Sequence, residues 1–316
     1  MSVHRSAQPA AGRVGESVLS DPAARAARTR AWVLLHFCVV LWGFTAIFGR
    51  LITLPALPLV WWRMGLVGAA LLLVPRFWRS VRGLPLRQIA IYAGIGVLVA
   101  LHWLTFYGSI KLSNASVGAT CMALMSVMMA FVEPLIVRRK FDTRELLFGL
   151  AVIPGVLLVV GGTPVAMRLG IAVGVLSALI LCVFGALNKR YIGRADALAV
   201  TGMEMVAGAA FLTCLGLLLP SGESMFAMPS QRDALFLLAL AMGCTLLPFT
   251  LGLVAMRQLS AFSTALALNL EPVYAIVLAI LLLDEQRELA WPFYAGVAII
   301  LAVVLLHARM MRTESP

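Results

Sequence analysis

Long apolar stretches separated by short polar joints occupy almost all of this chain. A helix that crosses a bilayer needs roughly 20 mainly apolar residues, because each residue rises about 1.5 Å and the hydrocarbon is about 30 Å thick. The apolar runs are continuous rather than alternating, which favours helices over the strands of a membrane barrel. We expect ten helices, over residues 31–52, 57–75, 88–110, 113–137, 145–163, 169–188, 197–219, 234–256, 260–283 and 290–308. The pattern therefore predicts an all-α integral membrane protein.

Composition agrees with a membrane-embedded chain. Hydrophobic residues make up 62% of the sequence and charged residues only 12%, whereas soluble domains average about 25% charged. Residues 1–30 differ from the rest, since they are rich in Ala, Arg, Ser and Gly and cannot pack a core. We expect a disordered cytoplasmic tail there. An organelle transit peptide is the alternative, which Glu16 and Asp21 weaken.

The net charge of +11 is distributed as a topology signal rather than as a nucleic-acid surface. Alternate connections between the expected helices, counted together with both tails, carry 19 of the 25 Lys and Arg residues, and the opposite connections carry four. Positive residues favour the cytoplasmic side of a membrane. Both termini are therefore expected in the cytoplasm, which requires an even number of crossings of the cell (inner) membrane.

The chain resembles itself at two similar offsets. A shift of 147 residues places Leu112-Ser113 on Leu259-Ser260, and a shift of 140 places Gly68-Ala69-Ala70 on Gly208-Ala209-Ala210. Both offsets imply a unit of five helices, and because five is odd the second copy must be inverted in the membrane. Inverted repeats are typical of secondary transporters, although chance matches between apolar runs are the alternative. We expect repeats over 31–163 and 169–308, followed by a cytoplasmic tail over 309–316.

Three short sequences give the chain a resemblance to a known family. They are Trp42-Gly43-Phe44, Arg63, and the stretch from Leu270-Glu271-Pro272-Val273-Tyr274-Ala275 to Leu283-Asp284-Glu285. The chain resembles the EamA-type members of the drug/metabolite transporter superfamily over all ten expected helices. The resemblance implies a 5 + 5 bundle, a central cavity and transport of small metabolites, without fixing the substrate.

Charged side chains inside a membrane are costly, by about 2.5–3.5 kcal/mol each, so each is a functional candidate. Glu271 is the deepest acid, and Pro272 beside it is expected to free the carbonyl near Leu268. Such a carboxylate could bind a cation or a proton, or it could be structural. Arg63 could hold a substrate carboxylate, or could snorkel or pair with an acid. Glu204 is expected to serve packing or a gate.

Prolines mark the expected breaks and gates. At the 147-residue offset, Met125 takes the place of Pro272, and Pro134 falls about two turns later. The first half is therefore expected to break its helix nearer the cytoplasm, at Pro134, so the two halves need not gate symmetrically. Pro248 is a further candidate break.

Aromatic residues within the spans suggest a substrate face. Trp103, Phe106 and Tyr107 share one side of a helix at i, i+3 and i+4 spacing, where they could stack a planar group or pack the core. Trp42 is also mid-span. His102 could titrate or simply form a hydrogen bond. The complete set of candidate residues for substrate binding or coupling is Glu271, Trp103, Tyr107, Phe106, Trp42, Arg63, His102, Asn269 and Tyr274.

No cofactor, metal or catalytic motif is expected. The five cysteines lack CxxC spacing, and no paired acids for metal-diphosphate chemistry occur. The pair Gly170-xxx-Gly174 permits close helix packing within one chain or between two, so the protein could be a monomer or a homodimer.

The leading hypothesis is a secondary transporter that works by alternating access, with proton coupling as an option. It would export or exchange a small amphipathic metabolite, first of all an amino acid, because an acid, an arginine and an aromatic face match an ammonium, a carboxylate and an apolar side chain. Other metabolites (a nucleotide-linked sugar, a cofactor or a cationic drug) and an integral-membrane lipid-modifying enzyme are the alternatives. A channel would need rings of charge or backbone filters, which are not visible.

Overall fold

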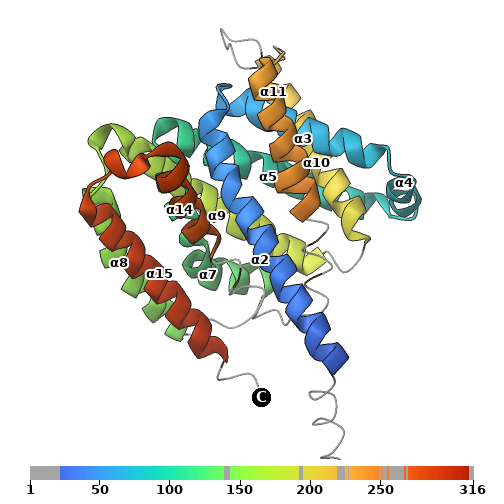
Figure 1. Cartoon of the computed structure of the whole chain (residues 1–316). Coiled ribbons are helices and arrows are strands. Elements are labelled where there is room, and N and C mark those ends of the chain that lie inside the picture. Colours follow the sequence, from blue (N-terminus) through green and yellow to red (C-terminus); the bar gives the residue numbers. More distant parts are fainter. Residues whose placement is uncertain are drawn as a thin grey trace, which may run out of the picture.

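The fold is a bundle of helices, described here from a computed structural model (Figure 1). The structure describes residues 22–138, 143–191, 195–218, 225–226, 228–248, 251, 255, 267 and 270–312. In chain order the first half contains α2 (Pro22–Leu51), α3 (Ala56–Leu72), α4 (Pro75–Val81), α5 (Leu86–Leu112), α6 (Ala115–Ala123), α7 (Met125–Val137) and α8 (Thr143–Gly161). The second half contains η1 (Val165–Met167), α9 (Arg168–Tyr191), α10 (Ala197–Leu218), α11 (Gln231–Leu238), η3 (Ala239–Leu246), α14 (Glu271–Leu283), η4 (Glu285–Arg287) and α15 (Trp291–Arg312).

Several of these helices are long and apolar enough to cross a membrane. Within the described residues four meet that requirement alone, and six do so if each of two bent pairs forms one span. The bends are 87° between α3 and α4 and 52° between α6 and α7. Three shorter apolar helices, in α8, α14 and α15, accompany them. The chain is thus a multi-pass helical membrane protein, and the expected total of ten crossings remains a prediction.

Helix contacts repeat between the two halves. At the offset of about 147 residues, α2 corresponds to α9, α3 to α10, α5 to η3, α6 with α7 to α14, and α8 to α15. α5 packs on α9 and α10, and its counterpart η3 packs on α2 and α3. α14 packs on α2, and its counterpart α7 packs on α9. The pairs α3–α10 and α8–α15 join an element to its own counterpart, as an approximate two-fold axis requires.

Backbone geometry at two helix ends carries the same repeat. Among the described non-glycine residues, only Arg138 and Asp284 have positive φ, at 62° and 55°. Each follows the last residue of its helix, α7 or α14, in the left-handed conformation that commonly ends helices. The two residues are 146 positions apart, so equivalent helices end in the same way.

The break in the first half differs from the expected one. Pro134 lies inside α7, and the chain bends instead at Leu124, between α6 and α7. At the 147-residue offset Leu124 corresponds to Glu271, the residue at which α14 begins. The helix interruptions therefore fall at matching positions in the two halves. In the first half the helix bends at Leu124 and continues through Pro134.

Glycines in α9 allow the tight packing expected within one chain. A Cβ atom on Gly170 would lie 2.7 Å from the Ser113 side chain, and one on Gly174 would lie 2.7 Å from Cys121 Sγ and Ser109 Oγ. Ser109 Oγ also donates to Gly170 O at 2.7 Å. The Gly-xxx-Gly face is thus used inside this chain, against α5 and α6.

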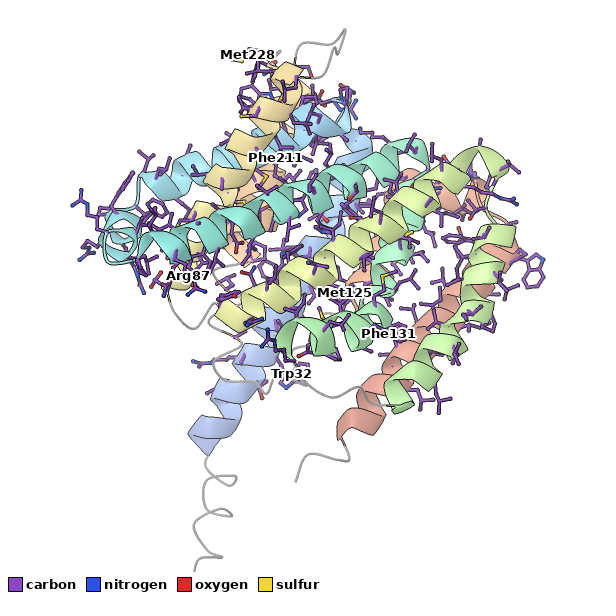
Figure 2. All side chains as sticks on the ribbon, turned by 180° about the vertical axis from the view of Figure 1, so that it is seen from behind. Trp32, Arg87, Met125, Phe131, Phe211 and Met228 are labelled. Atoms are coloured by element: carbon purple, nitrogen blue, oxygen red, sulfur yellow. The ribbon has the colours of Figure 1, made fainter. Side chains whose placement is uncertain are left out.

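α8 and α15 form a pair at one side of the bundle (Figures 1 and 2). They cross where a Cβ atom on Gly155 would lie 2.9 Å from Gly296 O. The pair meets the remaining helices through α7 and α6, and the Phe131 ring of α7 would lie 3.1 Å from a Cβ atom on Gly149. Apolar side chains of α8 such as Leu150 and Leu157 face outwards, as expected for contact with lipid.

Hydrogen bonds tie together one set of connections at one end of the bundle. Thr53, after α2, donates its N–H and hydroxyl to the Asp233 carboxylate at 2.9 and 2.5 Å. Glu285, after α14, accepts from the N–H groups of Ala115 and Ser116 at 2.9 and 2.8 Å and so caps the start of α6. Ala290 N donates to Gly162 O at 3.1 Å and so links the connection before α15 to the connection after α8. We call this region the acid-capped end.

At the opposite end of the bundle, a hydrogen-bonded ion pair joins two other connections. Arg76, at the start of α4, donates from Nε and Nη2 to the Asp196 carboxylate at 3.1 and 2.6 Å. Asp196 lies between α9 and α10, so the connections after α3 and after α9 lie on the same side. Alternate connections therefore collect at opposite ends of the bundle, as the charge pattern predicts.

Candidate functional site

A small cavity lies among α2, α5, α6 and α14. Its lining combines one acid, two large aromatic rings and small or flexible side chains: Trp42, Thr45, Ala46, Phe106, Ala119, Met122, Glu271, Pro272 and Ala275. Its volume is about 10 Å³, close to what one water molecule requires. The space is therefore smaller than any metabolite, and its lining comes from both halves.

Glu271 stands at the beginning of a helix inside the bundle. α14 starts at Glu271 after Leu270, so the carboxylate lies in the first turn, where free N–H groups and the helix dipole favour negative charge. Pro272 occupies the first turn, where its missing N–H is not needed. The sequence suggested that Pro272 lies in the interior of a helix, but in the structure it lies in the first turn of α14. Leu268, whose carbonyl was expected to be freed, lies outside the described residues.

Arg63 is a buried cation held by neutral partners. Only 3% of the residue is exposed, which contradicts the snorkelling alternative. Nη1 donates to Tyr107 Oη at 2.7 Å and Nε donates to Thr245 Oγ1 at 3.0 Å. The guanidinium carbon lies 3.7 Å from the centroid of the Trp103 ring. Among the described residues no acid forms an ion pair with Arg63.

Thr245 reaches Arg63 because the helix around it is wound differently. Residues Ala239–Leu246 form a π-helix, and Thr245 Oγ1 donates to Leu240 O, five residues earlier, at 2.9 Å. The hydroxyl oxygen is then free to accept from Arg63 Nε. Segments of π-helix are frequent at functional sites. The sequence analysis missed Thr245, whose only signal is a hydroxyl within the apolar run 234–256.

The aromatic face of α5 divides between two environments. Trp103 and Tyr107 contact Arg63, whereas Phe106 lines the cavity beside Trp42. His102 joins α5 to α9, since its Nδ1 lies 2.9 Å from Ser177 Oγ and Ser177 Oγ donates to His102 O at 2.8 Å. The three rings therefore do not form one stacking surface.

Close packing of α14 on α2 places Trp42 beside Glu271. A Cβ atom on Gly43 would lie 3.2 Å from Ala275 N, so only glycine permits this approach without displacement. Tyr274 points elsewhere, with its hydroxyl 3.4 Å from His36 Nδ1.

The remaining candidate residues are distributed along the bundle. Asn269 lies outside the described residues. Pro248 is buried, and it lies near the end of the described part of the eighth expected helix, 234–256. Thr45, Ala119 and Met122 line the cavity without having been singled out, because small and apolar residues in a membrane helix carry no distinguishing signal. Among the described residues no group of three His, Cys, Asp or Glu side chains could hold a metal ion.

Comparisons with known proteins agree with this arrangement. The family model described as the EamA-like transporter family matches twice, over residues 30–161 and 168–309. No curated protein matches. Eighteen solved chains do match. One, described as "Crystal structure of protein", is 17% identical, covers 89% of this chain and 99% of its own, and superposes with a TM-score of 0.57. At that identity the likeness extends to the fold alone.

Proposed function

This chain belongs to the EamA-like transporter family, a family of membrane transporters, and on that premise we propose that it is a secondary transporter of small amphipathic metabolites with Glu271 at its substrate site. The observation that carries the proposal is the cavity that Glu271 lines together with Trp42 and Phe106. An acid at a helix start inside an apolar bundle can bind a cationic group, and the two rings can cover the apolar part of the same molecule.

Arg63 supplies the complementary charge. A guanidinium carries five N–H donors, and among the described residues Tyr107 and Thr245 take two of them. The others remain for a carboxylate, which arginine binds in a bidentate manner. The acid that lines the cavity and the arginine bound to the adjoining side chain of α5 match the ammonium and the carboxylate of an amino acid. Amino acids or related compounds are therefore the first substrate class.

Alternating access would move this substrate. The cavity is too small for a metabolite, so helices would have to move apart, on one side at a time, to admit a substrate. We propose ten crossings arranged as two inverted halves of five, because the helix contacts exchange between the halves and two counterpart pairs pack on each other. Helix breaks at matching positions, Leu124 and Glu271, give both halves a hinge beside the cavity.

The charge pattern orients the molecule. The acid-capped end would face outwards, and the end containing Arg76 and Asp196 would face the cytoplasm together with both termini and most positive residues. The cell (inner) membrane is the proposed location. In this orientation the closed outer end leaves the cytoplasmic side to admit substrate, which suits an exporter or exchanger.

Counterflow in liposomes tests the proposal. Purified protein would be reconstituted into liposomes loaded with one unlabelled amino acid, and uptake of the same labelled compound would be followed. We expect saturable accumulation in loaded vesicles only. A thermal-shift series with amino acids, nucleotides, cofactors and cationic drugs would select the compound, since a ligand raises the stability of the folded state. Counterflow of a different metabolite would correct the substrate class, whereas product formation without counterflow would indicate an enzyme.

A further inference from the structure

A second buried acid lies outside the cavity. Glu204 of α10 is 4% exposed, and none of the cavity-lining residues comes from α10. The backbones of α5 and α10 are in close contact there, because a Cβ atom on Gly96 would lie 2.7 Å from Glu204 Cα, and Glu204 Oε1 itself is buried. The carboxyl group is therefore enclosed by protein, where an ionised carboxylate requires strong partners to offset its lost hydration.

Glu204 and Asn188 interact, and each has one oxygen without a partner. The side chain of Asn188, on α9, forms a hydrogen bond with the Glu204 carboxyl group. Within the described part of the chain, both Glu204 Oε1 and Asn188 Oδ1 are buried with no hydrogen-bond partner. Both atoms are acceptors as long as the acid is ionised, so neither can satisfy the other. What the pair lacks is a single hydrogen-bond donor.

The surrounding charged groups do not supply that donor. The ion pairs of the described residues are Arg50–Glu288 and Arg76–Asp196, so no cation there neutralises Glu204. Tyr92 donates to Tyr191 O and Arg190 donates to Ile136 O. The other described titratable side chains on the neighbouring α3, α4, α5 and α9 are Arg63, Arg79, Arg87, His102, Tyr107, Lys111, Arg168, Cys182 and Tyr191.

We propose that Glu204 and Asn188 form a proton-binding site, separate from the Glu271 cavity, in which Glu204 holds a proton while the bundle is closed. A hydronium ion gives its proton to Glu204 Oε1 and leaves as water, so that Oε1 becomes the missing donor and the acid and the amide can pair through two hydrogen bonds. An acid and an amide that exchange two hydrogen bonds leave neither buried oxygen without a partner.

The position of the pair fits exchange with the cytoplasm. Asn188 is three residues before the end of α9, and Glu204 is seven residues, or about 10 Å, from the start of α10. The connection between these helices contains Asp196, at the end of the bundle assigned to the cytoplasm. Separation of α10 from α5 would admit water and release the proton. The use of this proton in transport rests on the proposed function, whereas its binding does not.

Infrared spectroscopy of the full-length protein in liposomes tests the proposal. At neutral pH we expect the carbonyl band of a protonated carboxyl group, lost in Glu204→Gln and displaced in Asn188→Leu, which removes the amide partner. Glu271→Gln is the matched control and should leave that band in place. A wild-type spectrum without any protonated carboxyl band would overturn the proposal, as would a band that Glu204→Gln leaves intact.

The spectrum separates this inference from the proposed function. Protonated Glu204 in a protein that shows no counterflow would refute the transporter alone, and counterflow without the band would refute the proton site alone. Melting curves give a second readout for the wild type itself. Because the protonated pair is the satisfied one, we expect the melting temperature to fall as pH rises from neutral to alkaline, and to fall less in Glu204→Gln. Equal falls would contradict the proposal.

Discussion

The guanidinium carbon of Arg63 lies 3.7 Å from the ring centroid of Trp103, so the arginine of α3 makes a cation–π contact with a ring of α5. Such a contact contributes about 0.5–2 kcal/mol, depending on how far water is excluded. We expect Trp103→Leu to weaken substrate binding about fivefold, since about 1 kcal/mol changes affinity by that factor. Trp103→Phe keeps a ring under the cation and should lose less. Equal affinity of Trp103→Leu and wild type would show that Arg63 does not depend on this ring.

Tyr107→Phe tests how far the hydroxyl groups hold Arg63. The substitution keeps the ring but removes the acceptor of Nη1, leaving a buried charged donor without its partner. We expect a loss of about 1–3 kcal/mol in the free energy of unfolding, seen as a lower melting temperature. Thr245→Val should have a similar effect, through Nε. The two losses should not add, because both variants disturb one cation. An unchanged melting temperature in both would mean that Arg63 finds other acceptors.

Topology can be tested by labelling single cysteines in a variant without the five native ones. Met228, 83% exposed before α11, lies on the side proposed to face outwards, and Gly83, exposed after α4, lies on the side proposed to face the cytoplasm. We expect Met228→Cys to react with a membrane-impermeant thiol reagent on intact cells, and Gly83→Cys to react only after permeabilisation. The reverse pattern would invert the orientation.

The acid-capped end should act as a seal. Glu285 is 1% exposed and accepts two backbone N–H groups at the start of α6, so Glu285→Ala leaves both donors buried without partners, at a cost of about 1–3 kcal/mol each. With Ala119→Cys as a reporter in the cavity, we expect external thiol reagent to react faster in Glu285→Ala. Gln286→Ala changes an exposed neighbour and is the control. Unchanged labelling would show that this contact does not close the outer side.

Much of the architecture followed from local features of the sequence. Apolar runs predicted the helices, and Trp42-Gly43, Arg63 and Glu271-Pro272 identified the family correctly. The reason is that a membrane demands about 20 apolar residues per crossing, which leaves a strong pattern, and that charges inside such runs are rare.

The details of the site were less accessible, because they depend on contacts between distant segments. Arg63 looked equally suited to snorkelling, and only packing against Tyr107 and Thr245 shows it to be enclosed. Pro134 suggested a break, yet a proline alone does not fix where a helix bends, and the bend lies at Leu124. The π-helix that presents Thr245 leaves no pattern that distinguishes it from an ordinary apolar helix.

Transport by Glu271→Gln measures the central claim most directly. The substitution nearly preserves shape and removes the charge of an acid that lines the cavity together with Trp42 and Phe106. In liposomes with matched amounts of protein, we expect Glu271→Gln to abolish active transport and its pH dependence, and Glu271→Asp to retain part of the rate. Melting curves check that the variants are folded. Transport by folded Glu271→Gln at the wild-type rate and with the wild-type pH profile would contradict the claim and make this residue structural.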